Sequence, residues 1–151
     1  MRLAAAQEIT PNIEELTLKA FRITPRLGIA QINLHHAVAA SAVITRKFTS
    51  EDLGIVLVQE PWVYKGQVKG LTEKSIKVIW DLSCDNPRTC VMLKKETNYF
   101  CISEFLTRDL VAIQLTVNLN GQAREVVFAS AYFAGDAAIP PEEVRGLVEY
   151  S

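Results

Sequence analysis

Cysteine is scarce in this 151-residue chain, and its spacing does not suit a metal site. The three cysteines stand at positions 84, 90 and 101, so they leave an odd thiol and contain no C-x-x-C pair. This pattern argues against a disulfide framework and against a structural zinc site. We therefore expect reduced thiols and an intracellular protein.

The chain also lacks a large net charge and long apolar runs. The 16 basic and 17 acidic residues nearly cancel, so no global field draws the chain to nucleic acid or to a membrane. The N-terminus lacks the apolar core of a signal peptide, and the uncharged stretch 27–45 is too polar to span a bilayer. With 49% hydrophobic residues and no internal repeat, the composition predicts one globular domain without a membrane segment.

Two short apolar runs, each ending in a polar residue, carry most of the information. Residues 27–33 predict a strand that ends in Asn33, and residues 55–59 predict a strand followed at once by Glu60. The Ala-rich stretch 36–49 between them predicts a helix. Such a strand, helix and strand form a right-handed crossover with parallel strands, whose carboxyl ends meet at one sheet edge. The two polar residues are therefore expected together, where open α/β sheets place their sites.

The rest of the chain predicts mostly antiparallel strands and a last helix, and hence an α/β fold with a mixed sheet. Residues 1–25 are expected to form a peripheral helix or a linker. Asn120-Gly121 is typical of a two-residue hairpin turn, and Pro140-Pro141 suits the first turn of a helix. The expected later strands lie at about 75–80, 88–94, 98–103, 111–119 and 126–129.

Each polar candidate also has a purely structural interpretation. A carboxylate at a strand end is often solvated and paired with a lysine, but the polar neighbour on the parallel strand favours a metal ligand for Glu60. Asn33 alone is typical of an N-cap for the helix that follows it, and the two roles are compatible. His35 and His36 are expected to be structural, because adjacent residues on a helix do not share a face.

Three motifs, taken in order, resemble a known superfamily: Gln31-Ile32-Asn33-Leu34, Val58-Gln59-Glu60-Pro61-Trp62 and Ser130-Ala131-Tyr132. They are similar to the endonuclease/exonuclease/phosphatase superfamily, and specifically to the apurinic-type endonuclease domain of non-LTR retrotransposon polyproteins of the R1-like or jockey-like kind. The resemblance covers about 27–150. It implies the N-terminal part of a four-layer α/β sandwich with a mixed, mostly antiparallel sheet, and a truncated domain over 26–151.

The resemblance also implies roles for particular residues. Glu60 would be a ligand of Mg²⁺ or Mn²⁺, Asn33 would orient the metal shell or the phosphate, and Tyr132 would place its hydroxyl near the scissile phosphate. DNA is the implied substrate. A single carboxylate is a poor Mg²⁺ site, so metal binding is expected to be weak in this chain.

A basic and aromatic segment follows the second strand. Trp62, Tyr64, Lys65 and Lys69 combine positive charge with rings, as a DNA backbone groove requires. A charged loop is more often only solvated, so both interpretations stand.

The family's later motifs, G-D-x-N-A-H and S-D-H, are missing. Gly135-Asp136 does not replace the first, because Ala138 stands where the motif requires Asn. We therefore expect a fragment of a retrotransposon DNA endonuclease, weakly active or inactive alone, nuclear if it belongs to a retroelement protein, and prone to self-association through an exposed sheet face. A non-catalytic remnant or interaction module, or a phosphatase of the same superfamily, are the alternatives.

Overall fold

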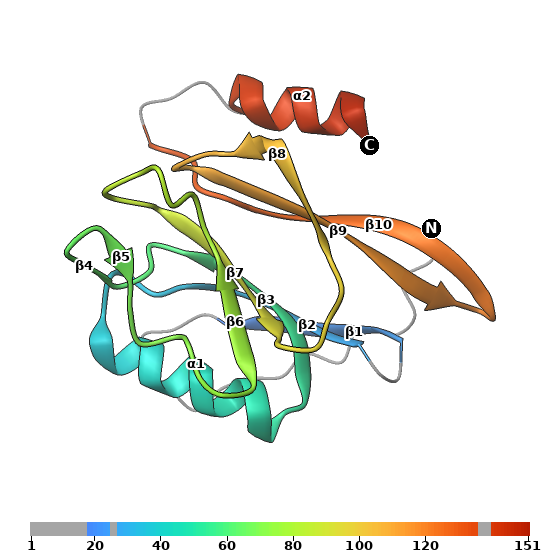
Figure 1. Ribbon diagram of the computed structural model, residues 1–151, viewed down its shortest axis with the longest axis horizontal. Coiled ribbons are helices and arrows are strands. Elements are labelled where there is room, and N and C mark those ends of the chain that lie inside the picture. Colours follow the sequence, from blue (N-terminus) through green and yellow to red (C-terminus); the bar gives the residue numbers. More distant parts are fainter. Residues whose placement is uncertain (1–17, 25–26, 136–139) are drawn as a thin grey trace.

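The computed structural model describes residues 18–24, 27–135 and 140–151, which are arranged in layers of helix, sheet, sheet and helix (Figure 1). Helix α1 (Val38–Ser50) covers the outer face of the first sheet, and α2 (Glu142–Tyr150) covers the outer face of the second. The predicted α/β class with a mixed, mostly antiparallel sheet is confirmed.

The first sheet holds the predicted crossover. Its strand order is β1-β2-β3-β7-β6, and β2 and β3 are parallel with α1 between them in the chain, whereas the other neighbours are antiparallel. Asn33 at the end of β2 lies opposite Gln59 at the end of β3. The strands are β1 (Lys19–Thr24), β2 (Leu27–Asn33), β3 (Leu53–Gln59), β6 (Ile76–Ile79) and β7 (Thr89–Lys94).

The second sheet is a three-stranded antiparallel meander with the order β10-β9-β8. Its strands are β8 (Phe100–Leu106), β9 (Leu110–Leu119) and β10 (Gln122–Ala131). Asn120 and Gly121 have φ angles of 52° and 79°, which suit the tight turn expected between β9 and β10. A two-stranded hairpin of β4 (Val63–Tyr64) and β5 (Gln67–Val68) forms where the sequence predicted only a loop.

Three apolar clusters hold the layers together. The first lies between α1 and the first sheet and contains Ile44 and Phe48, which are almost completely buried. The second fills the space between the two sheets, and the large apolar residues at odd positions of β9 face it: Val111, Ile113, Leu115 and Val117. The third joins the second sheet to α2 through Phe105 and Leu147.

The N-terminal segment differs from its prediction as a helix or linker. Residues 1–17 lie outside the described part, but 19–24 form β1, which pairs antiparallel with β2. Ala20, inside the segment expected to be peripheral, is instead 4% exposed in the core beneath α1. The open edge of β2 offers backbone hydrogen-bond partners to this segment, and the segment pairs with it as a strand.

Helix α1 begins two residues later than predicted, at Val38, because residues 35–36 form a turn. Its N-cap is Ala37, which makes no side-chain capping hydrogen bond. Asn33 is therefore not the N-cap of this helix. None of the helices in the described part of the chain is long and apolar enough to cross a membrane.

Candidate active site at the carboxyl ends of β2 and β3

Backbone hydrogen bonds continue beyond the ends of β2 and β3 and fix the position of Glu60. The amide of His36 donates to the Glu60 carbonyl at 2.9 Å, and the Glu60 amide donates to the Arg88 carbonyl at 2.8 Å. His35, His36 and Glu60 have φ angles of 48°, 58° and 48°, so three non-glycine residues with left-handed backbone meet here. Such conformations persist only where the surrounding structure holds them, and they gather at functional sites.

Both histidines approach the Glu60 carboxylate, whose side chain is 20% exposed. His35 Nδ1 lies 3.3 Å from Oε2, and His36 Nε2 lies 3.9 Å from Oε1. The sequence analysis placed these histidines on a helix, which was wrong, because they form the turn before α1. In the turn before α1 the left-handed backbone turns both rings toward the same carboxylate.

Asn33 stands beside Glu60, as the parallel crossover predicted, and shapes the turn that follows β2. Its Oδ1 accepts a hydrogen bond of 2.8 Å from the His35 amide. A side-chain oxygen bonded to a backbone amide two residues later is the usual stabiliser of such a turn. One acceptor of Asn33 is therefore already engaged.

A groove of about 430 Å³ brings Asn33 and Tyr132 together between β2 and β10. Its lining residues are Gln31, Asn33, Leu57, Gln59, Ala129, Ala131, Tyr132 and Phe133. A larger hollow of about 610 Å³ lies along α1 beside Gly70, away from the strand ends. The smaller groove is the better candidate for a site, because it joins two of the predicted residues.

Tyr132 is held by two residues of neighbouring strand ends. Its amide donates to the Asp109 carbonyl at 2.8 Å, and its ring lies under the Arg88 guanidinium, 4.4 Å from Cζ to the ring centroid. Arg88 also makes two hydrogen bonds to the Asp109 carboxylate, from Nε at 2.6 Å and from Nη2. Arg108, adjacent in the chain, makes a longer contact with the same carboxylate, 3.5 Å.

Beneath the groove, a buried polar network joins the two sheets. Gln59 Nε2 donates to Ser130 Oγ at 2.9 Å, and Ser130 Oγ donates to the Val58 carbonyl at 2.8 Å. Gln31 Nε2 donates to Gln59 Oε1. The sequence analysis assigned no role to this network, although a glutamine at the end of an apolar strand could have indicated a buried hydrogen-bonded partner.

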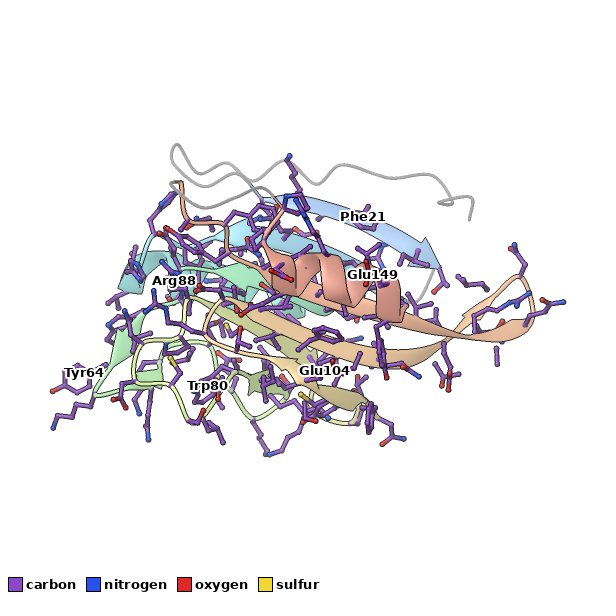
Figure 2. The ribbon with its side chains drawn as sticks, turned by 90° about the horizontal axis from the view of Figure 1, so that it is seen from above. Phe21, Tyr64, Trp80, Arg88, Glu104 and Glu149 are labelled. Carbon is purple, nitrogen blue, oxygen red and sulfur yellow. The ribbon has the colours of Figure 1, made fainter. Side chains whose placement is uncertain are left out.

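The residues predicted to contact DNA gather on the β4–β5 hairpin. The Tyr64 side chain is 54% exposed, and Lys65 Nζ lies 5.4 Å from its ring centroid. The Lys69 amide donates to the Trp62 carbonyl at 2.9 Å, which closes the hairpin. Figure 2 shows Tyr64 and Arg88 at the same end of the molecule, opposite the β9–β10 turn. The basic hairpin therefore lies at the end of the molecule that carries the strand-end residues.

The donor atoms do not make a good Mg²⁺ site. Among the described residues, no group of three or more His, Cys, Asp or Glu side chains is arranged to hold a metal ion. Glu60 offers one carboxylate, and the nearest further donors are imidazole nitrogens. Mg²⁺ prefers several oxygen ligands in octahedral geometry, so these residues do not fit it.

Comparison of the sequence with protein-family models finds no match, and comparison with curated proteins finds none either. Among solved structures, the chain is similar to the endonuclease domain of TRAS1, a telomere-specific non-LTR retrotransposon, with a TM-score of 0.65 and 19% identity. The match covers 82% of this chain and 54% of that one, so this chain spans about half of the TRAS1 domain.

An endonuclease/exonuclease/phosphatase family protein from Leptotrichia buccalis C-1013-b aligns with a TM-score of 0.49 and 12% identity, over 83% of this chain and 63% of its own. At these low identities the similarity shows the fold alone, and this conclusion rests on the TRAS1 match. The resemblance expected from the sequence is confirmed at that level: this chain has the fold of a non-LTR retrotransposon endonuclease domain.

Proposed function

We propose that residues 26–151 are the N-terminal part of a DNA endonuclease domain of a retrotransposon polyprotein, which nicks target DNA by phosphodiester hydrolysis when intact. One observation carries the proposal: Asn33 and Glu60 end adjacent parallel strands, and Tyr132 lines the same groove as Asn33. The chain spans about half of the TRAS1 domain, which supports the assignment to a part of such a domain.

Each residue of the site has a role in this proposal. Glu60 is a ligand of a divalent cation, Asn33 orients the metal shell or the phosphate, and the Tyr132 hydroxyl binds the phosphate. The residues of the β4–β5 hairpin bind the DNA backbone, with the lysines neutralising phosphates and the rings stacking on exposed bases: Trp62, Tyr64, Lys65 and Lys69.

The chain by itself is expected to cleave DNA poorly. Metal-assisted hydrolysis needs a Lewis acid, an oriented nucleophile and stabilisation of the leaving oxygen. The sequence contains no G-D-x-N-A-H or S-D-H motif to supply the last two. We place the protein inside the cell, in the nucleus as part of a retroelement protein, and propose self-association along the open edge of β10.

Nicking of supercoiled plasmid in Mg²⁺ tests the catalytic part of the proposal. We expect little nicking by the chain and none by Glu60→Ala, with Glu104→Ala, an exposed residue of β8, as the matched control. Efficient nicking that is lost only in Glu60→Ala would mean that the visible half of the site suffices and would overturn the fragment assignment. Equal nicking by all three proteins would identify a contaminating nuclease.

Binding of a fluorescent DNA duplex, followed by anisotropy across a salt series, tests the substrate. Lys65→Ala is expected to weaken binding and to reduce the salt slope by about 1, as loss of one phosphate contact does. Lys95→Ala is the control, because Lys95 is equally exposed but follows β7 at the opposite end of the sheet. Absence of DNA binding by the wild type would favour the alternatives, an interaction module or a phosphatase of the same superfamily.

A further inference from the structure

The ring of His36 is held in one orientation by the segment that carries Glu60. His36 Nδ1 lies 3.0 Å from the carbonyl oxygen of Pro61. A carbonyl oxygen only accepts hydrogen bonds, so Nδ1 carries the proton and donates it. In the neutral imidazole the other nitrogen, Nε2, therefore presents a lone pair. The backbone amide of His36 also donates to the Glu60 carbonyl, so the ring and the main chain are both fixed to one strand end.

The lone pair of His36 Nε2 faces a second acceptor. Glu60 Oε1 lies 3.9 Å away, which is too long for a hydrogen bond. Two bonds of about 2.0–2.2 Å that meet at a tetrahedral angle separate their donor atoms by about 3.4 Å. The His36 side chain is 52% exposed, so a small rotation closes the difference. Such a rotation brings the two acceptors to the separation that a shared metal cation requires.

We propose that His36 Nε2 and the Glu60 carboxylate bind a first-row transition metal cation of the Zn²⁺ or Ni²⁺ class in preference to Mg²⁺. Imidazole is a ligand of these cations, whereas Mg²⁺ selects oxygen donors. An Nδ1–H that donates to a backbone carbonyl is the usual way in which proteins orient a metal-binding histidine. Water completes the coordination at this open sheet edge.

His35 has a supporting part in this site. Its Nδ1 lies 3.3 Å from Oε2, the other oxygen of Glu60, where it orients the carboxylate and leaves Oε1 for the cation. The left-handed backbone of all three residues supports the same conclusion, because strained non-glycine positions gather where ligands are held. The inference deepens the proposed function in one respect, since it rests on Glu60 as a metal ligand, but it requires no catalysis.

Titration with Co²⁺, a spectroscopic substitute for Zn²⁺, tests the site in the full chain, with calorimetric titrations of Zn²⁺ and Mg²⁺ beside it. The wild type is expected to bind Co²⁺ and Zn²⁺ and to retain them in excess Mg²⁺. His36→Gln and Glu60→Gln are each expected to weaken binding by about tenfold or more. His35→Gln, the matched control at the adjacent position, is expected to lose less metal affinity than either of these two variants. Circular dichroism confirms that every variant is folded.

Several results would overturn the inference. Unchanged Zn²⁺ affinity in His36→Gln is one, and displacement of Zn²⁺ by equimolar Mg²⁺ is another. A thiolate-to-cobalt charge-transfer band that disappears in Cys84→Ser would assign the metal to a cysteine instead. Cys90 is a poor competitor, because complete burial raises the pKa of its thiol.

The inference and the proposed function fail separately. Mg²⁺ binding that depends on Glu60 but not on His36 would overturn the inference and leave the nuclease assignment intact. Absence of DNA binding would overturn the nuclease assignment, whereas the His36-dependent metal affinity would still stand.

Discussion

Asp109 has two arginines within reach, and they are not equivalent. Arg88 directly precedes β7, binds both carboxylate oxygens and lies over the Tyr132 ring. Arg108 precedes Asp109 in the chain, touches it at 3.5 Å, and is 49% exposed. From the sequence the adjacent arginine was the natural partner, because pairing across strands depends on a register that the sequence does not state.

Replacement of these two arginines should therefore have different effects. Arg88→Ala is expected to lower the free energy of unfolding by roughly 1.5–3 kcal/mol, because it leaves a half-buried carboxylate without its charged hydrogen-bond donors. Arg108→Ala is expected to cost less than about 1 kcal/mol, as an exposed pair does. Urea unfolding of both variants and of the wild type measures the difference. Equal losses would show that Arg88 is not the principal partner of Asp109.

At the scale of elements, the parallel crossover β2–α1–β3 was predictable because each piece agrees with its local pattern. Two apolar runs flank an Ala-rich helix, and the β9–β10 hairpin has both the alternation and the Asn-Gly turn that such hairpins need. The pairing of Asn33 with the end of β3 followed from the topology alone. These elements bring Asn33 next to the strand that precedes Glu60, and the function of that position stays a prediction.

Two elements were not predictable, for different physical reasons. Strand β1 is short and gains its stability from the edge of β2, so no property of its own sequence distinguishes it from a peripheral helix. The turn before α1 holds His35 and His36 in left-handed conformations that only tertiary contacts stabilise. Consequently their approach to Glu60 was not predicted.

Gly70, in the connection after β5, has a left-handed backbone and close neighbours. Its φ is 78°, and a Cβ placed there would lie 3.1 Å from both Ser41 Cβ and Trp62 Cε3. Gly121, in the β9–β10 turn, has a φ of 79°, but a Cβ there would meet nothing within 4 Å. The two glycines therefore share the conformational requirement and differ only in the space around them.

Gly121→Ala is expected to cost roughly 1–2 kcal/mol from the left-handed backbone alone. Gly70→Ala is expected to cost more, because its methyl group also pushes α1 and Trp62 apart. Thermal unfolding of the two variants, measured side by side, separates the steric part from the conformational part. Equal destabilisation would mean that the hairpin moves away from α1 without resistance.

At the scale of the whole molecule, the second sheet is more complete than a truncated sandwich suggests. The inner face of β9 is covered by the first sheet, and α2 covers the beginning of its outer face, whereas the β9–β10 turn extends beyond α2 (Figure 1). The open parts of this sheet include the free edge of β10, the groove beside it, and the Phe133 ring, which is 43% exposed. The exposed sheet face predicted from the sequence is thus smaller among the described residues, because α2 covers part of the second sheet.

An unpaired strand edge is a template for another chain, and the exposed Phe133 ring beside it adds apolar surface. We expect the protein to self-associate with rising concentration, and we expect Phe133→Lys to shift it toward the monomer, because a charge beside the edge opposes pairing. Leu82→Lys is the matched control, since Leu82 is 79% exposed and does not line the groove. Sedimentation velocity over a concentration series measures both variants. A monodisperse wild-type monomer that binds no dye for apolar surfaces would show that the β10 edge is protected within the chain itself.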